Sequence, residues 1–246
     1  MKKNIAAFLL LLLVSAPAQS QYLYKTTLLR ATPGKLLELI DLMKRRNDVH
    51  IQAGHEAPLL IRHSQGDHWD LLVLDPIESH QKYHSDEMRA KRRDAGMAAG
   101  FKSRDEYVTE FRELVAWHED TFVWGPPVEE FQKAGDGMNY FHVEMFVALP
   151  GKHAELLKQR EMENVYLKNI DRPQNLIFTH ESGGQWDAYT LGFYRDLKHF
   201  AESADIPEDK EDAAAKKAGF EGAAFIGTYL RSLIARHNDT LANRVK

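Results

Sequence analysis

The sequence predicts an α+β protein in which one β-α-β-β-α-β unit occurs twice along the chain. Three observations lead to this prediction. The two halves of the chain match each other, each half switches between the residue spacing of strands and that of helices, and a turn-rich segment separates the halves. Because the same order of elements is read from both halves, each half supports the prediction for the other.

The start of the chain has the pattern of a secretory signal peptide. Lys2 and Lys3 precede an apolar stretch at residues 5–14, and Ala16-Pro17-Ala18 supplies the small residues of a cleavage site. A helix that spans a membrane needs roughly 20 apolar residues, more than this stretch provides. We therefore expect residues 1–18 to be removed, leaving a soluble periplasmic or secreted protein without a membrane anchor.

Composition argues against some classes of partner and cross-link. The chain has a net charge of −4, which becomes −6 when the two leader lysines are lost. A nucleic-acid-binding protein needs a basic surface, so no nucleic-acid partner is expected. The chain contains no cysteine, so an exported form has no disulfide and depends on packing alone.

A shift of 117 residues aligns the first half with the second without a gap from Pro33, which falls on Pro150. After a two-residue insertion the shift becomes 119, and residues 112–121 then lie over residues 231–240. The predicted organisation is a first repeat at residues 21–125, a linker at 126–138 and a second repeat at 139–246.

Each repeat predicts the same elements in the same order. The first strands, residues 22–31 and 140–148, alternate apolar and polar positions, and Pro33 and Pro150 are expected to begin helices. A β-hairpin follows in each repeat, with a short loop that contains glycine. A helical region and a final strand complete the unit, and the final strand carries a His-x-Asp-Thr sequence in both repeats.

This order of elements resembles the ferredoxin-like arrangement, in which helices cover one face of a four-stranded antiparallel sheet. Two such sheets in one chain can cover each other, so the chain is similar to the dimeric α/β-barrel superfamily, as an intramolecular pseudo-dimeric α/β barrel. It also resembles NIPSNAP and antibiotic-biosynthesis-monooxygenase domains. The resemblance spans nearly all of the mature chain and implies a small hydrophobic or aromatic partner, with homo-oligomerisation left open.

The final strands carry the candidate catalytic residues. These are His118 and Asp120 in the first repeat and His237 and Asp239 in the second. Residues two apart on a strand point to the same face, so each histidine could pair with its aspartate and act as a general base on a phenolic substrate. The alternative interpretation is a polar contact that fixes the end of the strand.

The hairpins carry a candidate ligand-binding set of one histidine, one tryptophan and one aspartate. The set is His63, Trp69 and Asp70 in the first repeat and His180, Trp186 and Asp187 in the second. The histidine and aspartate could pair across the hairpin, with the tryptophan as the wall of a pocket. The alternative is that these residues fix the hairpin register by packing.

A further pair of ligand-binding candidates is His142 and Glu144, which replace Lys25 and Thr27 of the first repeat. The ferredoxin-like order places the first strand beside the last, so this pair could approach His237 or Asp239. Inside a barrel such a cluster would have perturbed pKa values. The pair therefore favours the second repeat as the functional one, unless these are ordinary polar residues.

The sequence predicts no metal or other cofactor. His80 and His84 have the i, i+4 spacing of metal ligands, but the second repeat has Leu197 and Ala201 there. Haem is an alternative, since some members of the superfamily bind it, and its candidate axial ligands are His118, His142, His180 and His237. The functions left open are a cofactor-less monooxygenase, a non-catalytic envelope or stress-response binding protein, and a haem or metal binder.

Overall fold

The computed structural model describes residues 22–245, and the predicted signal peptide lies outside them. The strands are β1 (Tyr22–Ala31), β2 (Leu59–Gln65), β3 (Leu71–Glu78), β4 (Val115–Gly125), β5 (Tyr140–Ala148), β6 (Leu176–Gly183), β7 (Ala188–Tyr194) and β8 (Ile234–Arg244). The helices are α1 (Leu36–Gln52), α2 (His80–Tyr83), α3 (Asp86–Ala98), α4 (Arg104–Leu114), α5 (Val128–Gly135), α6 (His153–Asn169), α7 (Leu197–Ala201), η1 (Glu202–Asp205), α8 (Glu208–Lys217) and α9 (Ala223–Arg231). Within this described range, no helix combines the length and the apolar character needed to cross a membrane.

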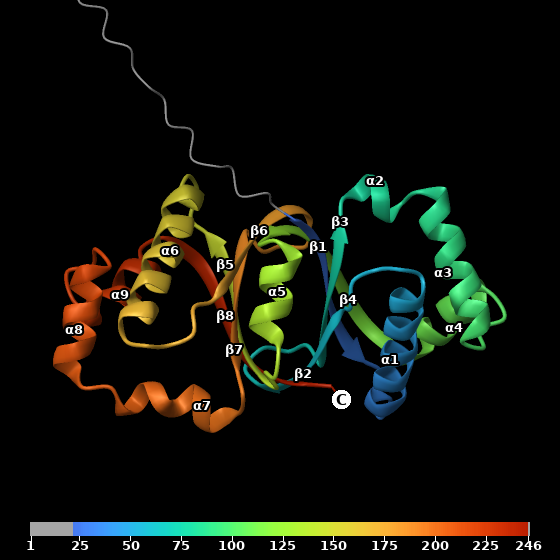
Figure 1. Cartoon of the computed structure of the whole chain (residues 1–246), viewed down its shortest axis with the longest axis horizontal. Coiled ribbons are helices and arrows are strands. Elements are labelled where there is room, and N and C mark those ends of the chain that lie inside the picture. Colours follow the sequence, from blue (N-terminus) through green and yellow to red (C-terminus); the bar gives the residue numbers. More distant parts are fainter. Residues whose placement is uncertain (1–21, 246) are drawn as a thin grey trace, which may run out of the picture.

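The strands close into one antiparallel barrel in the order β1-β3-β2-β8-β5-β7-β6-β4. Each half contributes four strands in the ferredoxin-like order, with its last strand beside its first. The halves join where β2 pairs with β8 and where β4 pairs with β6. Figure 1 shows the helices of the two halves on opposite sides of the central strands. The predicted α+β class and element order are therefore confirmed, whereas the common origin of the halves stays a prediction.

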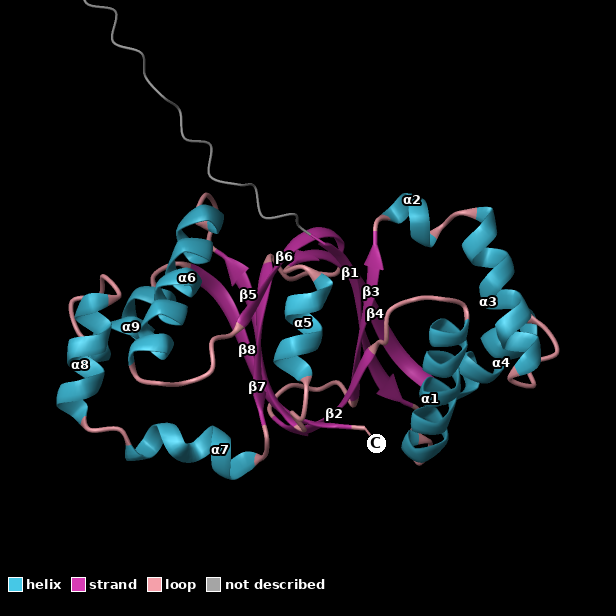
Figure 2. Ribbon diagram, in the orientation of Figure 1, coloured by secondary structure: helices cyan, strands magenta, loops and turns pink. Residues whose placement is uncertain are grey.

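Alternating positions on each strand separate the interior of the barrel from its outer face. On β5, Phe141, Val143 and Met145 belong to the core cluster inside the barrel. Phe146 and Ala148 belong to a separate cluster with Leu156 and Leu230 of α6 and α9. The same alternation holds in the first half, where α1 and α4 contribute to a third cluster on the outer face (Figure 2). The helices thus cover the outside of the sheet, and side chains fill the inside.

The long helices α1 and α6 begin three residues later than predicted. Gly34 and Gly151, which follow the two prolines, have φ of +81° and +78°. This left-handed conformation suits glycine and cannot be part of a right-handed helix. Each Pro-Gly pair is therefore part of a turn between strand and helix, and the helices begin at Leu36 and His153.

The segment predicted to be a linker contains the helix α5. Glu129 and Glu130 lie in its first turn, where negative charge is favourable, and Phe131 and Ala134 pack against the core inside the barrel. This helix was not predicted from the sequence, because the turn-forming residues at both ends obscured a short amphipathic segment.

A glycine in each hairpin allows the halves to approach closely. A Cβ atom on Gly66 would lie 2.0 Å from the carbonyl oxygen of Asp239, and one on Gly183 would lie 2.4 Å from that of Asp120. Any larger side chain at these positions would separate the hairpin from the opposing strand. The glycines match between the repeats because both joints between the halves need this contact.

A buried ion pair links the sheet to α1 in the first half. Arg46 donates two hydrogen bonds of 2.6 Å to the carboxylate of Asp75, whose side chain is buried. Burial by itself would raise the pKa of Asp75, but the adjacent charge and hydrogen bonds of Arg46 outweigh this effect and hold the pKa below its ordinary value. Asp75 is therefore ionised in the folded protein, and its charge is matched by Arg46.

Replacing Asp75 with asparagine should lower the free energy of unfolding by about 3–5 kcal/mol, because Arg46 would keep a buried charge without a counter-charge. Urea denaturation of the two proteins measures the difference. Asp94→Asn removes a carboxylate from an exposed ion pair with Arg93 and should leave the midpoint unchanged. Equal midpoints for Asp75→Asn and the unmodified chain would contradict the assigned role of this pair.

Candidate functional site

Polar side chains of β5 and β8 meet on the outer face of the barrel in the second half. Glu144 lies opposite Asp239 in the strand register, and His142 and His237 lie one diagonal step away on either side. We call His142, Glu144, His237 and Asp239 the histidine–carboxylate cluster. The predicted approach of these strands is confirmed, but the cluster lies between the sheet and the helices rather than inside the barrel.

The histidines of the cluster pair with carboxylates on the neighbouring strand. The distance from His142 Nε2 to Asp239 Oδ1 is 2.5 Å, and that from His237 Nε2 to Glu144 Oε1 is 3.4 Å. Positions two apart on one strand are separated by about 6.5 Å, whereas diagonal neighbours can reach each other with long side chains. The predicted pairing of His237 with Asp239 is therefore wrong, because each residue has a nearer partner on β5.

Arg160 of α6 supports the cluster from the helix layer. Its side chain is 1% exposed, with Nη1 3.4 Å from Glu144 Oε2 and a second nitrogen bonded to Glu163. The hydroxyl of Thr190 on β7 donates to the same Glu144 oxygen at 3.1 Å. Glu144 is thereby held in one position by groups from β7, β8 and α6.

Arg160 and its neighbour Gln159 were not among the predicted site residues. At a shift of 117 they align with Met43 and Leu42, which are buried apolar residues of α1. Two polar residues thus replace two core residues in the second half. This difference between the repeats, of the same kind as the one that identified His142 and Glu144, is the signal that could have identified them.

The charges of the cluster shift its pKa values in opposite directions. Burial would raise the pKa of Glu144, but the hydrogen bond with His237 and the charge of Arg160 lower it to about 2. Burial would lower the pKa of His142, but the hydrogen bond with Asp239 and the nearby charge of Glu144 raise it above its ordinary value. The site therefore keeps Glu144 ionised and makes His142 a stronger base.

Three residues of the cluster also have the arrangement of metal ligands. One donor atom from each of His142, Glu144 and Asp239 lies within 4.8 Å of the other two. Imidazole and carboxylate groups are common ligands of zinc and of manganese or iron. Three ionised carboxylates, those of Glu144, Asp239 and Glu163, carry more negative charge than Arg160 carries positive charge. With neutral histidines the site is therefore net negative.

The aligned positions of the first half make different contacts. Lys25 Nζ lies 2.9 Å from Asp120, and the hydroxyl of Thr27 donates to the same carboxylate at 2.6 Å. His118 instead packs against Phe111 of α4, with ring centroids 5.5 Å apart. The predicted pair of His118 and Asp120 is therefore wrong, and within residues 22–245 the His–carboxylate pairs at these positions belong to the second half.

The aspartates of the hairpin sets bind the backbone rather than the histidine of their own set. The carboxylates of Asp70 and Asp187 accept hydrogen bonds of 2.8 Å from the backbone N–H groups of Ala31 and Ala148. These bonds fix each hairpin to the end of the first strand of its half. The interpretation of these aspartates as determinants of hairpin position is therefore the one that the contacts favour.

The histidines of the hairpin sets have other surroundings. The backbone N–H groups of His63 and His180 donate to the backbone carbonyl oxygens of Asp70 and Asp187. The imidazole Nε2 of His180 lies 2.6 Å from the carbonyl oxygen of Gly183. The ring of His63 contacts Trp69 edge-on, with centroids 5.8 Å apart. The predicted side-chain pairing across the hairpins is thus wrong for both halves.

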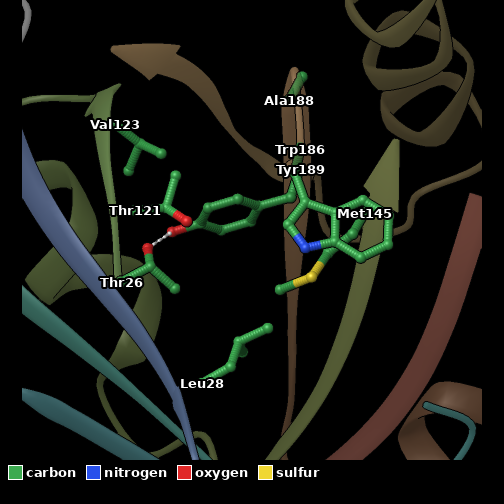
Figure 3. A pocket seen from close by; sticks show the side chains of 8 residues that line it. All are labelled: Thr26, Leu28, Thr121, Val123, Met145, Trp186, Ala188 and Tyr189. Atoms are coloured by element: carbon green, nitrogen blue, oxygen red, sulfur yellow. Dashed lines mark hydrogen bonds between the residues drawn. The ribbon is translucent and has the colours of Figure 1, made fainter. Parts of the chain in front are cut away.

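The tryptophans of the hairpin sets are part of the packed core. Trp69 and Trp186 are 0% and 4% exposed. Figure 3 shows Trp186 and Tyr189 beside a small cavity within the barrel, where the Tyr189 hydroxyl meets that of Thr26. The cavity volume is about 10 Å³, enough for about one water molecule. An aromatic ligand does not fit in this space, so Trp186 is not the wall of the ligand pocket that we predicted.

The four histidines considered as axial ligands have different surroundings in the structure. His142 and His237 direct a ring nitrogen at carboxylates, and His180 directs one at a carbonyl oxygen. His118 packs against Phe111 on the other side of the barrel. These contacts do not select any of the four as an axial ligand, so we derive no chemistry from haem.

Comparison with known proteins identifies the fold. No protein-family model matches the chain, and no curated protein sequence does. An anthrone oxidase-like protein superimposes with a TM-score of 0.56 at 14% identity over 92% of both chains. A monooxygenase-like protein from Fusobacterium nucleatum subsp. nucleatum superimposes with a TM-score of 0.56 at 6% identity, over 92% of this chain and 94% of that chain. A chlorite dismutase variant from Candidatus Nitrospira defluvii superimposes with a TM-score of 0.50 at 11% identity, over 92% of this chain and 93% of that chain. The chain therefore has the dimeric α/β-barrel fold that its resemblance predicted.

In metal-free protein, nuclear magnetic resonance titration should place the pKa of His142 above about 6.5, the ordinary value for histidine. Asp239→Asn should lower it, because the charged hydrogen-bond partner is lost. Since the folded-state pKa is raised, the pair stabilises the fold fully below pH of about 6.5, and this contribution is lost as pH rises through the folded-state pKa. Asp120→Asn, at the aligned position, serves as the control. A His142 pKa that Asp239→Asn does not change would show that the hydrogen bond does not form in solution.

Proposed function

We propose that this protein is an exported small-molecule-binding protein that acts as a cofactor-less oxygenase at the histidine–carboxylate cluster. The observation that carries the proposal is the His142–Asp239 pair, 2.5 Å apart, on a face that solvent reaches. The side chain of His142 is 17% exposed and that of Asp239 is 56% exposed, so a bound molecule can contact both. Export is supported by the signal-peptide pattern of residues 1–18.

The proposed reaction begins with proton transfer to His142. The imidazole takes a proton from a phenol or an activated aromatic ketone, and Asp239 orients the ring and stabilises the imidazolium that forms. The resulting delocalised anion gives electrons to molecular oxygen. One oxygen atom enters the product as a carbonyl group, and the other leaves as water with the two hydrogens lost by the substrate. The choice of substrate class follows the anthrone oxidase-like protein among the structural neighbours.

We also propose that the halves arose by duplication and that the second half alone retains the reactive site. The replacement of Lys25 and Thr27 by His142 and Glu144 supports this division. In the first half the carboxylate of Asp120 is neutralised by Lys25. The first half then contributes the other four strands of the barrel and serves as a scaffold.

The proposal is tested by oxygen uptake with anthrone as the substrate. His142→Gln should reduce kcat by about 10²–10⁴-fold, the usual contribution of a general base, and Asp239→Asn should also reduce it. Asp120→Asn is the matched control in the first half and should retain full activity. Urea midpoints of all variants separate lost chemistry from lost folding. Full activity of a folded His142→Gln variant, or no uptake by the unmodified protein with anthrone and simple phenols, would refute the proposal.

A divalent metal ion is the second candidate for the cluster, because His142, Glu144 and Asp239 have converging donor atoms. In this case, chelator-treated protein should bind Zn²⁺ or Mn²⁺ with one-to-one stoichiometry in calorimetry, and Asp239→Asn should bind it much more weakly. Oxygen uptake that survives chelation supports the cofactor-less reaction. Stoichiometric metal in the purified protein, together with loss of turnover on chelation, supports the metal instead.

A further inference from the structure

Two histidines are held together where α1 ends in the first half. Gly54 has a φ of +86°, and its backbone N–H donates to the carbonyl oxygen of Ile51 at 2.9 Å. The N–H of the next residue, His55, donates to the carbonyl oxygen of His50 at 3.0 Å. These two bonds form a Schellman motif, which ends a helix and brings the side chains of its first and last residues together. The two imidazole rings have centroids 5.1 Å apart.

Arg92 of α3 donates a hydrogen bond to the second of these rings. The distance from Nη1 of Arg92 to Nε2 of His55 is 2.9 Å. A guanidinium has donors and no acceptor, so the ring nitrogen accepts this bond and carries no proton. Arg92 also donates to the carbonyl oxygen of Tyr83 at 2.9 Å and lies over the Tyr83 ring, 4.6 Å from its centroid. The bond between α3 and the end of α1 thus exists only while His55 is neutral.

The surroundings of the two rings are mainly positive. The side chain of His50 is 10% exposed, and its Nδ1 lies 3.7 Å from Asp75, whose oxygens already accept two hydrogen bonds from Arg46. The charged and titratable groups that face the rings are Arg46 of α1, Asp75 of β3, Lys82 and Tyr83 of α2, and Arg92 of α3. Lys82 is paired with Glu78. Protonation of both rings would therefore leave four positive groups around one carboxylate.

Both rings resist protonation in the folded protein. Burial and the charge of Arg46 hold the pKa of His50 well below its ordinary value, and burial and the charge of Arg92 lower the pKa of His55 to about 4. In an unfolded chain both residues titrate near a pH of about 6.5. Because the folded-state pKa values are lowered, this contact stabilises the fold fully above pH of about 6.5, and the contribution decreases as the pH falls toward about 4. The direction is opposite to that of His142.

The aligned positions of the second half form the same motif with residues that do not titrate near neutrality. At a shift of 117, Leu167 takes the place of His50 and Arg172 that of His55. The backbone N–H of Arg172 donates to the carbonyl oxygen of Leu167 at 2.8 Å, and its guanidinium lies 2.9 Å from Glu202. An arginine stays charged at any accessible pH. The second half therefore keeps its contact in mild acid, whereas the first half depends on neutral histidines.

Few apolar contacts hold α3 on the first half. Of its 13 residues, Met88 and Ala95 are buried. Segments with few buried apolar contacts open at a lower cost in free energy than the core of a protein. Figure 1 shows α3 at the outer edge of the first half, away from the central strands. The polar contact of Arg92 with His55 is thus a large share of what fixes this helix, and its loss need not disturb the barrel.

We propose that His50 and His55 form a pH-sensitive latch, which holds α3 on the end of α1 at neutral pH and releases it in acid. Protonation of His55 replaces its hydrogen bond from Arg92 with repulsion between two positive groups. α3 then separates from α1, and the pair of Arg46 and Asp75 becomes accessible to solvent. The latch shares no residue with the histidine–carboxylate cluster, and neither proposal depends on the other.

Amide hydrogen exchange of the purified protein at pH of about 7.5 and about 5 tests the proposal. After correction for the intrinsic effect of pH on exchange, the protection of α3 should fall by about tenfold or more, because each histidine that gains a proton on opening changes the equilibrium by up to about tenfold per pH unit. α8 aligns with this helix at a shift of 119 and should keep its protection. This comparison needs no variant, so it decides even where a variant folds poorly.

His55→Gln keeps an acceptor for Arg92 but cannot be protonated, so this variant should fold and lose the pH dependence. His153→Gln removes a histidine of the second half whose side chain is 60% exposed, and the pH dependence should stay unchanged. The proposal is overturned if α3 of the unmodified protein is equally protected at both pH values, or if α8 loses protection to the same extent. It is also overturned if His55→Gln loses protection in acid as the unmodified protein does.

Discussion

The closed barrel imposes one constraint on the rest of the molecule, which is that every strand has an inner and an outer face. The inner face is filled by large side chains such as Trp69, Phe141 and Phe178, which are almost completely buried. Dense packing of this kind leaves little room for water or ligand. Polar residues that contact one another are therefore concentrated on the outer face, beneath the helices, and at the joints between the halves. The histidine–carboxylate cluster lies on this outer face.

The outer layers of the two halves differ in how they balance charge. In the first half, Arg46 and Lys25 neutralise Asp75 and Asp120. In the second half, Glu144 is shared among a histidine, an arginine and a threonine hydroxyl. An arginine stays charged at any accessible pH, whereas a histidine gains and loses protons near neutrality. The first arrangement favours stability, and the second leaves groups that can exchange protons with a bound molecule.

Much of the fold could be predicted from the sequence, but the contacts of the site could not. β1 and β5 have the predicted limits because alternation along a strand is a local property. Pairing of His142 with Asp239 depends on the register between β5 and β8, and neither strand determines that register alone. Arg160 was missed because its contact with Glu144 depends on how α6 packs on the sheet, which the sequence of the helix alone does not determine. The role of Trp186 depended on how side chains from both halves fill the barrel, which no single segment reveals.

The closure of the barrel also limits how copies of this chain can associate. An open sheet exposes backbone N–H and C=O groups at its edge strands, and those groups can recruit a strand from another molecule. Here β2 and β6, which would be the edges of two separate sheets, pair with β8 and β4 of the opposite half. The described strands therefore offer no free edge to a second copy. An oligomer built from the described residues would therefore form through side chains on the outside of the molecule, which can change in evolution without disturbing the barrel.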